Sequence, residues 1–231
     1  MADSEAIRSS ATTIADRLDR TCTVIVNYQT PDLLEDAVAS FKRFYPEVHL
    51  VIVDNGSKDE SSNVIRRLCK EYHLCVFLFL KKNLGHGPVM HAMMERAEYE
   101  FYFLLDSDTV TKKGGFLEKM LAEFDDGSVY GVGKVAPFNK HGFHDEESGT
   151  SMLIAAYMLI RSSFYQGLPP FEHHGVPVAR NFYESSKKGY HMIDFPIERF
   201  IDHLHRGTVG RFGYGLGLKG KINYLLNKLG L

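Results

Sequence analysis

Cysteine is scarce in this chain, and a long apolar run and a strong excess of one charge are both missing. The 231 residues include three cysteines, Cys22, Cys69 and Cys75, and the closest two are six positions apart. That spacing does not match a metal-binding pair, so we expect buried free thiols in a reducing compartment. No apolar stretch is long enough to span a bilayer, and residues 1–20 lack the apolar core of a signal peptide. These absences lead us to expect a cytoplasmic protein.

Neither the net charge nor the composition points to a specialised class of protein. A formal net charge of −2 gives no general attraction for nucleic acid, so we expect no nucleic-acid partner. The contents of 44% hydrophobic and 24% charged residues are ordinary for a globular protein, and the length suits one domain. We expect a polar lead-in over 1–20, one domain with halves 21–136 and 137–208, and a separate basic segment over 209–231.

Apolar strands alternate with amphipathic helices in the first half of the chain. The strand patterns cover 22–27, 49–54, 74–80 and 101–105, and the helical patterns cover 31–44, 60–72 and 88–97. In the first helix, Leu34, Val38 and Phe41 fall on one face. Because the strands are almost wholly apolar and have βαβ spacing, we predict an α/β fold with a mostly parallel central sheet flanked by helices. After Pro137 the pattern changes to polar loops and one apolar run over 152–160, which indicates an elaboration of the same domain.

The triplet Asp106-Ser107-Asp108 follows the apolar strand that starts at Phe101. Side chains at i and i+2 of a strand point the same way, so the two carboxylates are expected to converge where the strand ends. Open α/β sheets bind ligands at that edge. Hard oxygen ligands of this kind suit Mg²⁺ or Mn²⁺ bound together with substrate phosphates. The alternative is a solvated Asp-rich turn, because Asp is common where strands end.

Four segments occur together in a recognisable order and spacing. They are 24–31 (VIVNYQTP), 52–57 (IVDNGS), 83–85 (NLG) and 104–108 (LLDSD). As a set they resemble the GT-A glycosyltransferases of family 2, over roughly residues 22 to 208. The resemblance implies a GT-A-like fold, with a nucleotide-binding half over 21–136 and an acceptor half over 137–208. It also implies a UDP-, GDP- or dTDP-sugar donor and a Mn²⁺ or Mg²⁺ cofactor.

The resemblance assigns donor contacts to residues in each of these segments. They are Asn27, Tyr28, Thr30, Asp54, Asn83, Gly85 and Asp106. Tyr28 can pack beside a base, or it can be an ordinary loop aromatic. Asp54 can accept hydrogen bonds from a base or a ribose, or it can form an Asx turn. The loop from Asn83 can approach phosphate or shape the base pocket, and His86 within it is consistent with an ordinary loop histidine.

The resemblance also implies a metal site that draws on the second half of the chain. Asp106 would touch the ribose or the metal, and Asp108 would ligate the metal. His203 and His205 could supply a further ligand, with His203 preferred, and Arg206 could contact the diphosphate. The alternative for the two histidines is an exposed pair without a ligand.

A general base is missing from its usual place in the family pattern. Inverting members commonly carry an acidic pair about a dozen residues before a Gly-Tyr, but Pro177 and Val178 occupy that slot here. The nearby Glu172, His173 or His174 could replace it, because a carboxylate or an imidazole can accept the acceptor proton. Asp194 is a more distant candidate, and a chemistry without a protein base is the remaining alternative.

The C-terminal segment reads as a basic amphipathic helix. Leu218, Ile222, Leu225, Leu226 and Leu229 form an apolar stripe, accompanied by lysines. Such a helix can lie on an anionic membrane surface, here the cytoplasmic face, which would suit a lipid-linked acceptor. Alternatively, it packs on the body of the protein or on the partner of a homodimer.

Taken together, these features predict an enzyme that moves a sugar from a nucleotide-diphosphate donor to a glycan, lipid-linked or other hydroxyl acceptor. Metal assistance and inversion are expected from the resemblance. Two alternatives remain open. One is a non-catalytic nucleotide-sugar-binding protein, suggested by the missing acidic pair. The other is a sugar nucleotidyltransferase, although the Gly-rich basic signature expected near its first strand does not occur at 27–31.

Overall fold

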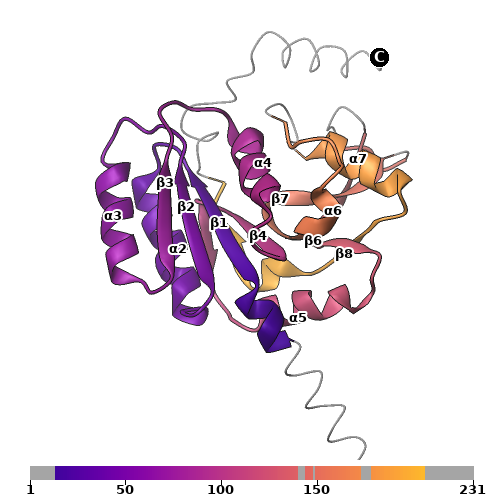
Figure 1. The fold of residues 1–231 in the computed structure, drawn as a ribbon, viewed down its shortest axis with the longest axis horizontal. Helices are drawn as coiled ribbons and strands as arrows, with labels where there is room; N and C mark the ends of the chain where they lie inside the picture. Colours follow the sequence, from indigo (N-terminus) through magenta and orange to yellow (C-terminus); the bar gives the residue numbers. More distant parts are fainter. Residues whose placement is uncertain (1–13, 140–143, 148, 173–177, 206–231) are drawn as a thin grey trace, which may run out of the picture.

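The first half of the chain forms the strand–helix alternation that the sequence pattern predicts (Figure 1). The computed structural model describes residues 14–139, 144–147, 149–172 and 178–205. A short helical segment over 14–19 leads into the first strand. The elements are β1 (Thr21–Asn27), α2 (Pro31–Phe44), β2 (His49–Asp54), α3 (Ser61–Glu71), β3 (Cys75–Phe79), α4 (His86–Arg96) and β4 (Phe101–Asp106).

Shorter and more irregular elements follow in the second half. They are β5 (Thr109–Thr111), α5 (Phe116–Ala122), η1 (Glu123–Asp125), β6 (Val129–Phe138), β7 (Thr150–Arg161), α6 (Ser162–Tyr165), α7 (Ala179–Lys187), β8 (His191–Asp194), η2 (Ile197–Arg199) and β9 (Ile201–His203). The predicted apolar run over 152–160 is the body of β7, a strand buried along most of its length.

The central sheet has seven strands in the order β3-β2-β1-β4-β7-β6-β8. β1 pairs in parallel with β2 and β4, and β2 pairs in parallel with β3. After β1 the chain forms β2 and β3 on one side of that strand, and then crosses over to form β4 on its other side. This reversal is the topological switch point at which open α/β sheets bind ligands, beyond the carboxyl ends of the strands. β7 is antiparallel to both β4 and β6, so the sheet is mixed.

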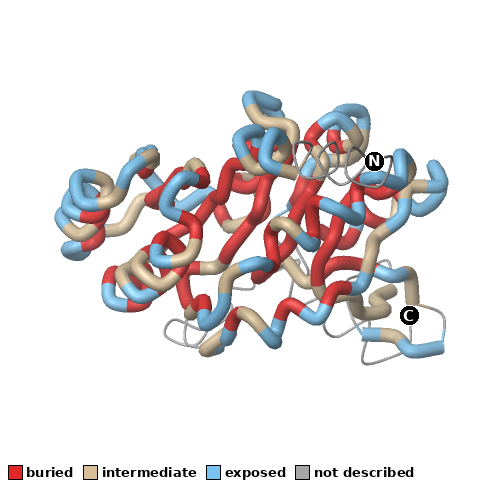
Figure 2. The backbone as a smooth tube through the Cα atoms, turned by 90° about the horizontal axis from the view of Figure 1, so that it is seen from below, coloured by how far each residue is buried: buried red, intermediate tan, exposed pale blue. Residues whose placement is uncertain are grey.

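Helices cover both faces of the sheet, as predicted (Figure 1). One apolar cluster joins α2, α3 and α5 to the strands, and it includes Phe41, Ile65 and Phe103. The other joins α4, α6 and α7 to the opposite face, and it includes Met93 and Phe182. Figure 2 shows the buried strands enclosed by half-buried and exposed helices and loops. Truncating one such buried side chain to alanine costs about 2–5 kcal/mol, so these two layers hold the strand ends in fixed positions.

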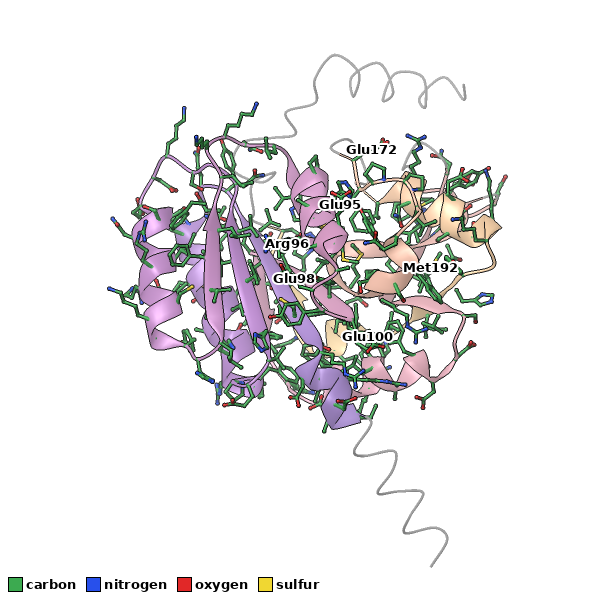
Figure 3. All side chains as sticks on the ribbon, in the orientation of Figure 1. Glu95, Arg96, Glu98, Glu100, Glu172 and Met192 are labelled. Carbon is green, nitrogen blue, oxygen red and sulfur yellow. The ribbon has the colours of Figure 1, made fainter. Side chains whose placement is uncertain are left out.

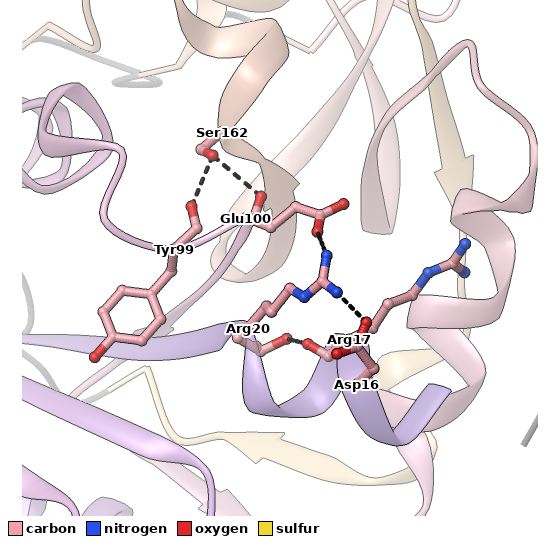
Figure 4. Close-up of polar contacts among 7 residues, drawn as sticks. Asp16, Arg17, Arg20, Tyr99, Glu100 and Ser162 are labelled. Atoms are coloured by element: carbon pink, nitrogen blue, oxygen red, sulfur yellow. Dashed lines mark hydrogen bonds and ion pairs between the residues drawn. The ribbon is translucent and has the colours of Figure 1, made fainter. Parts of the chain in front are cut away.

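Polar contacts fix the amino end of β4 (Figure 4). Arg20 forms an ion pair with Asp16, and its guanidinium lies 3.2 Å from the Glu100 carboxylate. The Ser162 hydroxyl donates to the carbonyl oxygen of Tyr99 at 2.7 Å. These contacts lie at the end of the strand opposite Asp106.

A buried lysine near the end of α2 joins two loops, the one between α2 and β2 and the one between α3 and β3. The Lys42 ammonium donates to the carbonyl oxygens of Pro46, Val48 and His73, at 3.1, 2.6 and 2.7 Å. Burial lowers the pKa of Lys42 from its usual value. Its three carbonyl partners compensate part of the cost of burying the charge.

The three cysteines are free, as expected. Cys22 and Cys75 are buried, whereas Cys69 is partly exposed, with its sulfur 3.2 Å from that of Cys75. Among the described residues, no helix has the length and apolar character needed to cross a membrane. The predicted basic segment 209–231 lies outside the described residues.

Candidate metal and donor site

Two carboxylates and one imidazole converge beyond the carboxyl end of β4. The short strands β5 and β9 pair antiparallel, with Thr109 opposite His203. This pairing brings His203 Nε2 to 3.1 Å from Asp108 Oδ1 and 3.7 Å from Asp106 Oδ2. One potential ligand atom from each residue lies within 4.8 Å of the others. The predicted acidic pair and the preferred histidine therefore lie in one cluster.

The charge of the two carboxylates acts on His203. Burial tends to lower the pKa of His203, but the hydrogen bond with Asp108 and the charges of Asp108 and Asp106 outweigh it. The net result is a pKa above the usual 6.5. The two carboxylates therefore favour the imidazolium form of His203, which compensates part of their negative charge.

The cluster fits a divalent cation by its chemistry. Carboxylate oxygens are the ligands that Mg²⁺ and Mn²⁺ prefer, and imidazole is a common ligand of transition metals, Mn²⁺ included. The Asp108 side chain is 7% exposed and that of His203 is 18% exposed, so only Asp106, at 26%, is substantially open to solvent. A ligand from solution would therefore reach the cluster from the Asp106 side.

Two aromatic rings lie against His203. Tyr157 of β7 packs edge-on against the imidazole, with ring centroids 6.0 Å apart. Burial, followed by the charges of Glu198 and Asp106, raises the pKa of Tyr157 to about 12. His205 is exposed, and its ring centroid lies 4.1 Å from that of His203. His205 is therefore next to the cluster but outside the set of three converging ligands.

A further histidine, from the same half of the chain as the acidic pair, lies close to Asp106. His86 is the first residue of α4, and its Nε2 lies 3.4 Å from Asp106 Oδ1. The sequence pattern offered no reason to separate it from an ordinary loop histidine. Tyr157 was also not identified, because within the apolar run of β7 it looks like another core residue.

A buried hydrogen-bond network connects the predicted donor residues to the triplet. The Asn27 amide donates to Asp54 at 2.9 Å, and the Thr30 hydroxyl donates to the Asn27 carbonyl group at 3.0 Å. The Thr30 hydroxyl also lies 3.1 Å from that of Ser107. Asn27 and Thr30 are 0% exposed, and Asp54 is 4% exposed. These residues therefore join the ends of β1, β2 and β4.

Asp54 also forms the turn that was its alternative role. Its carboxylate accepts hydrogen bonds from the Ser57 hydroxyl at 2.6 Å and the Ser57 backbone N–H at 3.1 Å. These bonds close the turn after β2. Tyr28, which follows β1, is half-buried and thus partly accessible to a ligand. A donor contact by Asp54 remains a prediction.

The loop before α4 is held by amide side chains. The side-chain Oδ1 of Asn83 accepts hydrogen bonds from the side-chain amide of Asn55 at 3.0 Å and from the Gly85 backbone N–H at 2.8 Å. Gly85 has φ 93° and ψ 159°, a conformation essentially restricted to glycine. The loop enters α4 at a fixed angle, two residues earlier than the sequence predicted, and Pro88 is accommodated in the first turn.

The acceptor-side candidates are only partly described. Glu172 is labelled in Figure 3 at the end of the molecule opposite Glu100, and therefore on the side where β4 ends. Its carboxylate is 51% exposed and lies 3.0 Å from Arg180. His173, His174 and Arg206 lie outside the described residues.

Asp194 stands apart from the metal cluster. Its carboxylate accepts from the Val135 backbone N–H at 2.8 Å. It belongs to β8, three strands from β4, and strands are spaced about 4.8 Å apart. The sheet therefore places Asp194 well away from the acidic pair.

A family profile and several curated proteins match this chain. The profile described as Glycosyl transferase family 2 matches residues 22–184, more than half of the chain. The poly-β-1,6-N-acetyl-D-glucosamine synthase of Staphylococcus epidermidis is 30% identical over 84 residues, which cover 36% of this chain and 20% of that protein. The protein of the same name from Staphylococcus aureus (strain MSSA476) is 25% identical over 96 residues, covering 41% and 23%. The matched regions thus span about a fifth of these relatives.

Solved structures share the fold at low sequence identity. The mannosyltransferase PcManGT from Pyrobaculum calidifontis, in complex with GDP-Man and Mn²⁺, has a TM-score of 0.59 and 15% identity, covering 77% of this chain and 55% of that one. S. aureus TarS 1–349, in complex with UDP-GlcNAc, has a TM-score of 0.61 and 14% identity, covering 90% and 65%.

Proposed function

Because this chain belongs to glycosyltransferase family 2 and has a GT-A-like fold, we propose that it transfers a sugar from a nucleotide-diphosphate donor to a hydroxyl group of a glycan or a lipid-linked acceptor. The observation that carries the proposal is the convergence of Asp106, Asp108 and His203 at the switch point of the sheet. These side chains come from segments 95 positions apart. Ligands of this kind at this edge suit a donor diphosphate with its cation.

Asp106, Asp108 and His203 would hold Mn²⁺ or Mg²⁺. A bound cation would neutralise the charge that develops on the leaving nucleoside diphosphate. The two carboxylates bring the negative charge that attracts the cation. Tyr157 and the β5–β9 pairing keep His203 in place and shield it from water. Arg206 could contact the diphosphate.

The donor would enter above the ends of β1 and β2. Tyr28 and Asp54 would contact the base or ribose, and the loop of Asn83 and Gly85 would close the pocket. The structural relatives bind GDP-Man and UDP-GlcNAc, which supports a sugar nucleotide as the donor class. Asn27 and Thr30, both fully buried, would act by fixing Asp54 and Ser107.

Glu172, His173 and His174 remain the candidates for the base that takes the acceptor proton, in an inverting transfer. A base role for Glu172 requires its carboxylate to exchange Arg180 for the acceptor hydroxyl. Its backbone lies against α4, whose first residue contacts Asp106, so residue 172 is close to the donor side. The basic amphipathic segment 209–231 would bind anionic lipid, which would suit a lipid-linked acceptor.

A thermal-stability screen tests the proposal. The protein is heated with UDP, GDP or dTDP, each with Mn²⁺ and with excess chelator. One nucleotide should raise the melting temperature only when the cation is present, because a ligand that binds the folded state stabilises it by mass action. The matching sugar nucleotide should then be hydrolysed slowly in the absence of an acceptor. No stabilisation by any nucleotide would contradict the donor site, and binding without hydrolysis would favour a non-catalytic module.

A further inference from the structure

We propose that His86 is a positioning residue that holds the Asp106 carboxylate in the orientation in which it binds the cation. This inference rests on the proposed function, namely that Asp106, Asp108 and His203 bind a divalent metal. The donor-binding motif residues that the resemblance implies do not include His86.

The two oxygens of Asp106 face two different histidines. Oδ1 lies 3.4 Å from His86 Nε2, and Oδ2 lies 3.7 Å from His203 Nε2. His86 is not a member of the group whose ligand atoms all lie within 4.8 Å of one another. One oxygen of Asp106 is therefore directed toward the cluster, and the other is directed toward α4.

Asp106 needs such a contact more than Asp108 does. The Asp106 side chain is 26% exposed, whereas that of Asp108 is 7% exposed. Rotation of an open carboxylate at a strand end is opposed by few neighbours. A donor on the Oδ1 side would limit this rotation and leave Oδ2 directed at His203 and the cluster.

The backbone around His86 is rigid enough to position the imidazole. Gly85 before it has a glycine-only conformation and donates its N–H to Asn83. Gly87 after it packs so closely on the next segment that an added Cβ would lie 1.8 Å from the Glu172 carbonyl oxygen. The helix itself is anchored by buried Val89 and Met93. His86 therefore sits on a fixed helix start, held on both sides.

Residues outside the direct ligands commonly tune metal sites in this way. Ligating carboxylates are usually hydrogen-bonded by a second residue, and loss of that residue typically weakens metal affinity about 10–100-fold. The His86 side chain is 35% exposed, so its contact with Asp106 contributes little to folding stability. Its effect should appear in metal binding instead.

Titration of Mn²⁺ into the full chain, with UDP or GDP present, tests the proposal by calorimetry. His86→Phe keeps a ring but removes the donor, and it should raise the Mn²⁺ dissociation constant about 10–100-fold. His86→Gln returns an N–H near the position of Nε2 and should bind within a few-fold of wild type. His91→Phe is the matched control, because His91 lies on the same helix but faces Tyr165, 2.7 Å away. Its Mn²⁺ affinity should match wild type.

Donor hydrolysis gives a second readout. His86→Phe should need more Mn²⁺ for half-maximal rate, by the same factor, and its rate at saturating Mn²⁺ should approach that of wild type. Equal Mn²⁺ affinity in wild type and His86→Phe would overturn the positioning role and leave the proposed function intact. Equal losses in His86→Phe and His86→Gln would also overturn it, because they would make His86 a ligand. If wild type itself binds no Mn²⁺, the metal site of the proposed function fails instead.

Discussion

Replacing Asp108 with asparagine removes a charge from the cluster and changes its shape very little. The Asp108 side chain is 7% exposed, and its Oδ1 lies 3.1 Å from His203 Nε2. The backbone carbonyl of Asp108 accepts from the Leu204 N–H at 2.9 Å, and β5 pairs with β9 through backbone bonds. These backbone contacts survive the substitution, so Asp108→Asn should fold.

The loss of activity can be estimated from what a cation contributes. Stabilisation of developing charge by a bound metal is worth several kcal/mol. A loss of about 4 kcal/mol, at 1.36 kcal/mol per tenfold change, corresponds to about 10³-fold in rate. Asp108→Asn should therefore lower donor turnover by about 10³-fold and abolish the Mn²⁺-dependent rise in melting temperature.

The same substitution has a pH-dependent effect on the metal-free protein. Contacts with Asp108 and Asp106 raise the pKa of His203 in the folded state. A raised pKa means that this stabilisation is fully present below the usual pKa of about 6.5 and is lost as pH rises through the folded-state value. Asp108→Asn should therefore destabilise the metal-free protein by about 1–2 kcal/mol at about pH 5.5, and by less at about pH 8.

Release of nucleoside diphosphate from the sugar nucleotide measures the first effect, and urea unfolding at the two pH values measures the second. Asp202→Asn is the matched control, because Asp202 neighbours His203 on β9 but is exposed and paired with Lys112. The control should keep wild-type turnover. Asp108→Asn with wild-type turnover and unchanged Mn²⁺ dependence would refute the metal role, and a stability loss that grows with pH would refute the electrostatic account of His203.

Three other tests address separate parts of the site and the fold. Asp54→Ala should weaken nucleotide binding by about 1–3 kcal/mol in calorimetry, and unchanged affinity would leave Asp54 as a turn residue. At least one of Glu172→Gln, His173→Ala and His174→Ala should lower kcat by about 10²-fold or more with donor affinity kept; near-wild-type turnover in all three would place the base elsewhere. Lys42→Met should lower the free energy of unfolding in urea by about 2–4 kcal/mol, because three carbonyl groups lose a charged donor; a loss below about 1 kcal/mol would contradict this account.

The first half of the fold could be predicted because its signals are local. Helix α2 begins and ends at the predicted residues, Pro31 and Phe44, since a proline in the first turn and a clear apolar face mark it. The apolar strands β1, β2 and β4 were recognised for the same reason. The acidic pair could be placed because a strand end fixes the direction of its side chains.

The second half depends on pairings that leave little local trace. β5 and β9 have three residues each, too few for a periodic pattern, yet their pairing brings His203 to Asp108. His203 was expected only through the resemblance to family 2. The direction of β7, antiparallel to β4, likewise comes from long-range packing and could not be read from its apolar composition.

The family motifs contain both fully buried residues and partly exposed ones, and the two kinds have different roles. Asn27 and Thr30 are fully buried, and their side chains form hydrogen bonds with other side chains of the network. A donor could therefore reach them only if the strand ends opened. Tyr28 and Asp106 are partly exposed and can touch a donor without such a change. Substitution of Asn27 would therefore act through the position of Asp54. A sequence motif alone cannot make this distinction, because adjacent residues such as Asn27 and Tyr28 carry equal weight in it while the fold turns one inward and leaves the other accessible.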